Sequence, residues 1–88
     1  MSDEVMFVGV KQRIVTLLSE SEMTLADLAL DVYGKKPTVA DPLNNMRTQL
    51  SGMRKALAEH ETDTRFIRTT RKPGVNQSTY RLVRVGNL

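Results

Sequence analysis

Apolar residues in the first part of the chain recur at the spacing of two amphipathic helices. The first helix is predicted between residues 8 and 18, with apolar positions at Val10, Ile14, Leu17 and Leu18. Thr24 opens the second, because its hydroxyl can cap a helix whose third residue is Asp27. The apolar positions of this second helix are Leu25, Leu28, Ala29 and Val32. Gly34 ends it, since glycine is common just past a helix C-terminus.

The third predicted helix, residues 42–58, has the clearest pattern. Asp41 is a good N-cap, and Pro42 suits the first helical position because its missing N–H needs no partner there. Apolar residues then alternate at spacings of three and four: Leu43, Met46, Leu50, Met53 and Leu57. These positions fall within about 80° of arc. We therefore expect all of them to be buried along one stripe.

The opposite face of this third helix is polar and carries no acidic residue before Glu59. An ordinary solvated helix face mixes glutamate with lysine, so this absence is informative. The candidate binding residues on or beside the face are Asn45, Arg47, Thr48, Gln49, Gly52, Arg54 and Lys55. We interpret the face as a reader of DNA in the major groove, the alternative being a plain or protein-binding surface.

Beyond residue 63 the pattern changes to that of β-strands. Residues 65–71 and 78–85 are rich in β-branched and aromatic side chains, and the segment between them has the composition of a turn. Together they predict a hairpin over residues 64–85. The predicted fold class is α+β: a winged helix-turn-helix of three helices, within residues 9–58, followed by a β-hairpin wing. One domain accounts for residues 1–88.

Four segments carry a family resemblance. Residues 24–34 end in an aromatic–glycine pair, residues 46–57 contain a hydrophobic pair followed by Arg-Lys-Ala-Leu, and residues 65–71 and 80–82 read as strands flanking a wing. In this order they resemble the DNA-binding effector domains of OmpR/PhoB-type response regulators. Two features depart from that family. Its N-terminal antiparallel sheet has no equivalent here, and the wing is longer by about five residues.

The resemblance implies binding to double-stranded DNA, with helix 42–58 in the major groove and the 71–79 wing at the adjacent minor groove. It also implies that Arg54 contacts phosphate, that Thr69 makes another such contact near the wing base and that Arg71 reaches the minor groove. Lys72 is expected to contact phosphate or the minor groove together with Arg71, the alternative being that both charges only keep the hairpin soluble. Gly52 stands where relatives often carry a long polar side chain.

Charge supports a polyanionic partner. The chain has 88 residues and a net charge of +3, but residues 1–42 carry −3 and residues 43–88 carry +6. Such asymmetry favours nucleic acid as the partner of the second half. There is no cysteine, which excludes a disulfide scaffold and thiolate metal sites. The apolar runs are far shorter than the ~20 residues that span a bilayer, so we expect no membrane partner and a cytoplasmic, nucleoid-associated protein.

Catalysis finds no support in the residues. His60 is the only histidine and has no plausible serine–acid constellation, and no glycine-rich phosphate loop occurs. We expect no enzymatic activity and no cofactor. The expected function is that of a small transcriptional regulator, of phage or mobile-element type, that binds DNA with sequence preference. The alternative is a winged-helix module that acts by protein contact on RNA polymerase or another regulator.

The N-terminal arm or strand, residues 1–8, contains the apolar segment 5–8 and leaves two possibilities open. As an adhesive arm, it would bind a second copy of the chain, giving a weak or DNA-induced dimer. As an arm or strand packed on its own core, it would replace the sheet that the family has in this place.

Overall fold

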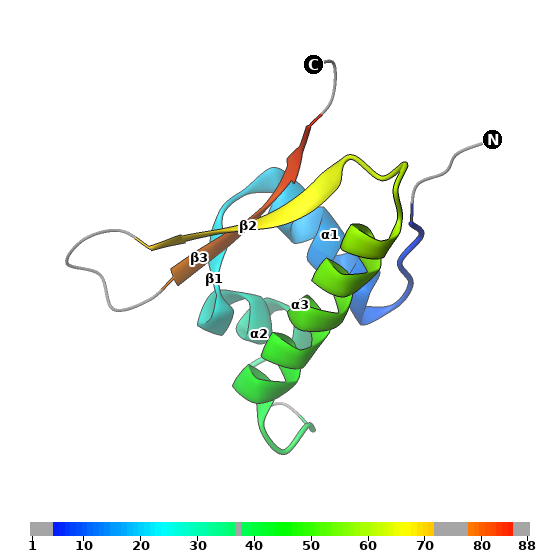
Figure 1. The fold of residues 1–88 in the computed structure, drawn as a ribbon. Coiled ribbons are helices and arrows are strands. Elements are labelled where there is room, and N and C mark those ends of the chain that lie inside the picture. The colour runs from blue at the N-terminus through cyan, green and yellow to red at the C-terminus, as the bar shows by residue number, and fades with distance from the viewer. Residues whose placement is uncertain (1–4, 37, 72–77, 86–88) are drawn as a thin grey trace.

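The structure, a computed structural model, describes residues 5–36, 38–71 and 78–85. Its elements in chain order are α1 (Val10–Glu20), β1 (Met23–Thr24), α2 (Leu25–Tyr33), α3 (Pro42–Glu59), β2 (Arg65–Arg71) and β3 (Ser78–Arg84). The hairpin of β2 and β3 lies along one side of the three helices, and α3 crosses in front of α1 and α2 (Figure 1). An α+β fold with three helices and an antiparallel hairpin is thus confirmed.

The sheet is three-stranded and antiparallel, in the order β1-β3-β2. The sequence analysis did not predict β1, because two residues are too few to show an alternating pattern. Its residues Met23 and Thr24 pair with Tyr80 and Thr79 of β3. This pairing ties the connection between α1 and α2 to the middle strand of the sheet.

The predicted helix ends are confirmed where a local hydrogen bond sets them. The Thr24 hydroxyl accepts from the Asp27 N–H at 3.1 Å, and the Asp41 carboxylate accepts from the Asn44 N–H at 3.1 Å. Gly34 follows α2 with a φ of +83°, a region that glycine enters without steric cost. The first helix begins at Val10, two residues later than predicted, after the N-cap Gly9. It also continues two residues further, to Glu20, because polar residues at a surface helix end still fit the helical backbone.

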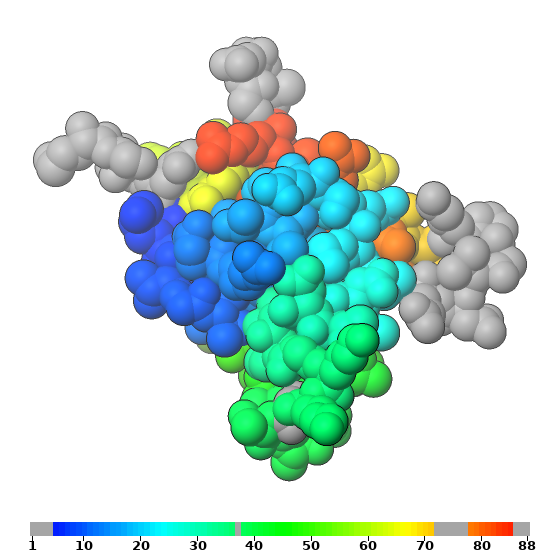
Figure 2. All heavy atoms as spheres, turned by 180° about the vertical axis from the view of Figure 1, so that it is seen from behind, coloured from blue at the N-terminus to red at the C-terminus, as the bar shows by residue number. Residues whose placement is uncertain are grey.

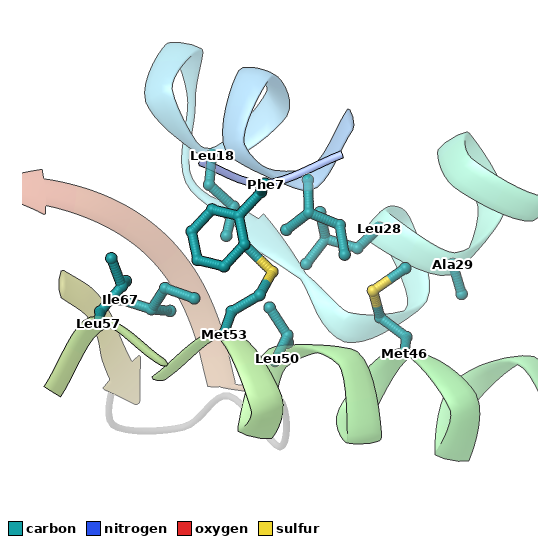
Figure 3. Packing of buried hydrophobic residues seen from close by; sticks show 10 residues of the cluster. Phe7, Leu18, Leu28, Ala29, Met46, Leu50, Met53, Leu57 and Ile67 are labelled. Atoms are coloured by element: carbon teal, nitrogen blue, oxygen red, sulfur yellow. The ribbon is translucent and has the colours of Figure 1, made fainter. Parts of the chain in front are cut away.

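The core is built on α3. Its buried side chains Met46, Leu50, Met53 and Leu57 point toward residues of the other elements, as Figure 3 shows for Phe7, Leu18 and Leu28. The prediction that Leu43 is buried is wrong, because this side chain is 45% exposed. Helical spacing fixes the direction of a side chain but not how far the neighbouring elements reach, and the buried stripe begins one turn later, at Met46.

The N-terminal arm, residues 5–8, packs on its own core without forming a strand. Phe7 is buried there, and the Val5 N–H donates to the Asp63 carboxylate at 2.9 Å. Arg65 completes the fastening, since its guanidinium donates to the Val5 carbonyl and to Asp63 Oδ2, the latter at 2.9 Å. Of the two possibilities left open by the sequence, packing on its own core holds for Val5 and Phe7. Met6 and Val8, in contrast, are 82% and 81% exposed.

Candidate nucleic-acid interface

One side of α3 presents an exposed basic and hydroxyl surface. Arg47, Thr48 and Lys55 are all exposed, as the sequence predicted, and Asn44 and Ser51 lie between them. The Thr48 hydroxyl donates to the Asn44 carbonyl of the same helix at 3.0 Å. This hydrogen bond fixes the rotamer of Thr48 and therefore the direction of its methyl group. The surface therefore offers two cations and short polar groups, with no carboxylate before Glu59.

Asn45 and Gln49 lie at one edge of this surface and are half-buried. The Tyr33 hydroxyl, at the end of α2, donates a hydrogen bond to the Asn45 carboxamide oxygen. Burial raises the pKa of Tyr33, and its hydroxyl, which is protonated at neutral pH even without this shift, is able to donate. The contact fixes the Asn45 carboxamide and joins α2 to the first turn of α3.

Gly52 lies on a different flank of α3, about 140° around the helix from Arg47. A Cβ at Gly52 would meet the Lys11 side chain of α1 at 3.9 Å. Gly52 also lines an open cavity of about 320 Å³ together with Phe7 and Lys11. Its place in the fold is beside the N-terminal arm, on the side of α3 away from Arg47.

Arg54 and Thr69, which the sequence predicted as separate contacts, meet in the structure. The Arg54 guanidinium donates to the Thr69 hydroxyl and, at 3.4 Å, to the Ile67 carbonyl of β2. Its central carbon lies 5.6 Å from the centroid of the Tyr80 ring of β3, a cation–π distance. Arg54 thus connects α3 to both strands of the hairpin. Sequence reasoning missed this role because it depends on how distant elements pack.

Arg71 is exposed at the last position of β2, opposite Ser78 of β3. Because side chains alternate along a strand, it shares a face of the sheet with Thr69, the face against which Arg54 packs. Lys72 and the rest of the wing between the two strands lie outside the described residues. Arg71 therefore lies on the side of the hairpin that faces α3.

A second set of residues, missed in the sequence analysis, lies on the other face of the hairpin. Arg68 and Arg81 are direct cross-strand partners and both are exposed. Strict alternation along residues 65–71 is the signal that could have separated them from Thr69 and Arg71.

Comparison of this chain with protein-family models, with curated proteins and with solved structures finds no match. Within the described ranges, no three acidic or histidine side chains are grouped so that they could hold a metal ion. No helix in that part of the chain is both long and apolar enough to span a membrane.

Proposed function

We propose that the protein is a winged-helix protein that binds double-stranded DNA with sequence preference and acts as a small transcriptional regulator. In this proposal α3 enters the major groove and the β2–β3 hairpin lies over the adjacent minor groove. The observation that carries it is the surface of α3 with no acidic residue before Glu59, where Arg47 and Lys55 are exposed, together with the exposed Arg71 at the end of β2. None of these three cations forms a salt bridge within the described residues.

The dimensions of α3 fit this use. Its 18 residues form a rod about 27 Å long, and the major groove is about 12 Å wide, enough to admit a helix. Arg47 and Lys55 would neutralise phosphates, and the Thr48 methyl would meet a thymine methyl. Gln49, at the edge of the surface, would pair with an adenine edge. The exposed part of this set is small, so we expect modest discrimination between sequences.

The proposal is tested by mobility shift on random duplex DNA at about 50 mM and about 200 mM salt. Binding that weakens by a factor of roughly 10 or more between the two conditions means that phosphates are neutralised. Arg47→Gln should weaken binding to all sequences and lower the salt slope by about one. Arg13→Gln is the matched control, because Arg13 pairs with Asp31 of α2 at 2.8 Å. Absence of binding at both salt concentrations would overturn the proposal and favour a protein-contact module.

Specificity is tested on a site selected from a random DNA pool. Gln49→Ala should cost about 1–3 kcal/mol on the selected site and little on random DNA. Equal losses on both would assign Gln49 to the DNA backbone.

A further inference from the structure

The sheet surface turned away from the helices, which we call the outer face, carries Phe66, Arg68, Arg81 and Val83. The register pairs Phe66 with Val83 and Arg68 with Arg81, so these four side chains project from the same side. The side chains between them in sequence, such as Ile67, belong to the opposite side and pack on the core. In Figure 1 the three helices lie on one side of the hairpin, and in Figure 2, from behind, the blue and cyan atoms of α1 and α2 lie below the red and orange atoms of β3.

The centre of the outer face holds two cations side by side. Arg68 and Arg81 are direct cross-strand partners, a position where like charges repel and weaken the sheet. Neither β2 nor β3 contains an acidic residue, and Asp63, just before β2, is engaged by Arg65. The exposed Glu22 precedes β1, whose Met23 pairs with Tyr80 next to Arg81, but it forms no salt bridge within the described residues. The two guanidinium groups have no carboxylate partner in the described part of the chain. An external carboxylate between them would remove the repulsion.

One end of the outer face is apolar. Phe66 is 41% exposed and Val85 is 39% exposed, and Val83 lies between them. Phe66 also borders an open cavity of about 160 Å³ between β2 and α3, whose other lining residues are Arg54, Leu57, Ala58, Arg65 and Ile67. A cavity of about 150 Å³ is large enough for a benzene-sized group. An exposed aromatic residue beside arginines is also the composition of energetically important protein–protein contacts.

We propose that the outer face binds an acidic segment of a partner protein. Two carboxylates of the segment pair with Arg68 and Arg81, and an apolar side chain rests on Phe66 and enters the cavity beside it. A protein fits better than a nucleic acid for two reasons. Single strands bind on several stacked aromatic residues, whereas Tyr80 lies on the opposite face under Arg54. Duplex phosphates would leave the apolar end unused.

The outer face and the proposed DNA surface lie on opposite sides of the hairpin, because Thr69 and Arg71 alternate with Arg68. The hairpin can therefore hold DNA on one side and a protein on the other. This inference does not rest on DNA binding, and the two proposals can fail separately.

The experiment uses the full chain and fluorescein-labelled peptides of 15 residues in which Asp or Glu alternates with Leu or Phe. Counterparts carry Asn and Gln in place of the acids. Fluorescence anisotropy at about 150 mM salt should show the acidic peptides binding at least tenfold tighter than these counterparts. Amide chemical shifts should change at residues 66, 68, 81 and 83, on the unmodified protein. Equal affinity for acidic and neutral peptides, or shift changes confined to α3, would overturn the proposal.

Two matched variants separate the surfaces. The double variant Arg68→Gln, Arg81→Gln should lower the affinity for the acidic peptides at least tenfold and leave the salt slope of DNA binding unchanged. Arg47→Gln with Lys55→Gln removes the same charge from α3 and should leave peptide affinity unchanged. A loss of about two units of DNA salt slope in the first variant would mean that the outer face contacts duplex phosphates, which contradicts the proposal. Folding of both variants is checked by circular dichroism.

Discussion

The guanidinium group of Arg54 in α3 donates a hydrogen bond to the hydroxyl of Thr69 in β2. This contact connects the helix and the hairpin that we propose to enter adjacent grooves of DNA. Arg54 therefore has a structural role in addition to its proposed contact with phosphate. The two roles can be separated by replacing either Thr69 or Arg54.

Thr69→Val removes the acceptor and keeps the charge of Arg54. We expect it to lower the free energy of unfolding by about 1 kcal/mol and to leave the salt slope of DNA binding unchanged. Arg54→Ala should lower stability by about 1–2 kcal/mol, because it also loses the Tyr80 ring contact, and should lower the salt slope by about one. Denaturant titration and binding at several salt concentrations measure both effects. An unchanged salt slope in Arg54→Ala would leave Arg54 with the structural role alone.

Protonation of Asp63 at low pH should weaken the attachment of the N-terminal arm and lower the stability of the protein. The hydrogen bonds from the Arg65 side chain, with further bonds from the Arg65 and Val5 backbones, lower the pKa of this carboxyl from 3.8 to about 2. The pKa is lower in the folded state, so the stabilisation is present above pH 3.8 and is lost as the pH falls toward 2. The loss is about 2 kcal/mol over this window.

Asp63→Asn isolates this contribution, because every other carboxyl group remains. Denaturant titrations between pH 6 and pH 2 should show a shallower decline in stability for the variant than for the unmodified protein. Parallel declines for the two proteins would show that Asp63 does not hold the arm.

The cross-strand pair on the outer face should cost stability. Arg68→Thr removes the repulsion from Arg81 and places a β-branched residue in the strand, so the free energy of unfolding should rise by about 0.2–1 kcal/mol. The electrostatic part of this gain should shrink in about 1 M salt, where the Debye length falls to about 3 Å. Thermal melting at low and high salt measures it. A variant less stable than the unmodified protein at low salt would contradict the prediction.

Two leucines of α3 provide a test of the corrected core. Leu50 is buried, and Leu50→Ala should cost about 2–5 kcal/mol because it leaves a cavity. Leu43 is exposed in the first turn, and Leu43→Ala should cost less than about 1 kcal/mol. Equal losses in denaturant titration would mean that Leu43 is buried after all.

The features predicted correctly from the sequence are those set by neighbours in the chain. Thr24 and Asp41 cap helices through N–H groups three residues away, and the stripe from Met46 to Leu57 follows from helical period alone. The exposure of Leu43 and the two-residue strand β1 depend on where other elements end, and local pattern carries no information on that. The contact between Arg54 and Thr69 depends on the angle between helix and hairpin, for the same reason.

The candidate site also contains residues whose placement follows from the local pattern and residues whose placement depends on tertiary packing. Arg47, Thr48 and Lys55 are exposed as predicted, because their direction follows from the apolar stripe opposite them. Asn45 and Gly52 lie against α2 and α1, and the position of those helices is a tertiary property. The assignment of any of these residues to DNA stays a prediction that the binding experiments test.

The hydrogen bond from the Val5 N–H to the Asp63 carboxylate joins residues 58 positions apart in the chain. A contact of this range closes about two thirds of the 88-residue chain into a loop, and the entropic cost of closing a loop rises with its length. The arm is held by one buried aromatic ring, Phe7, by the half-buried Val5 and by a few hydrogen bonds. Native-state hydrogen exchange should therefore show the arm opening at a lower free energy than the helices that carry the core.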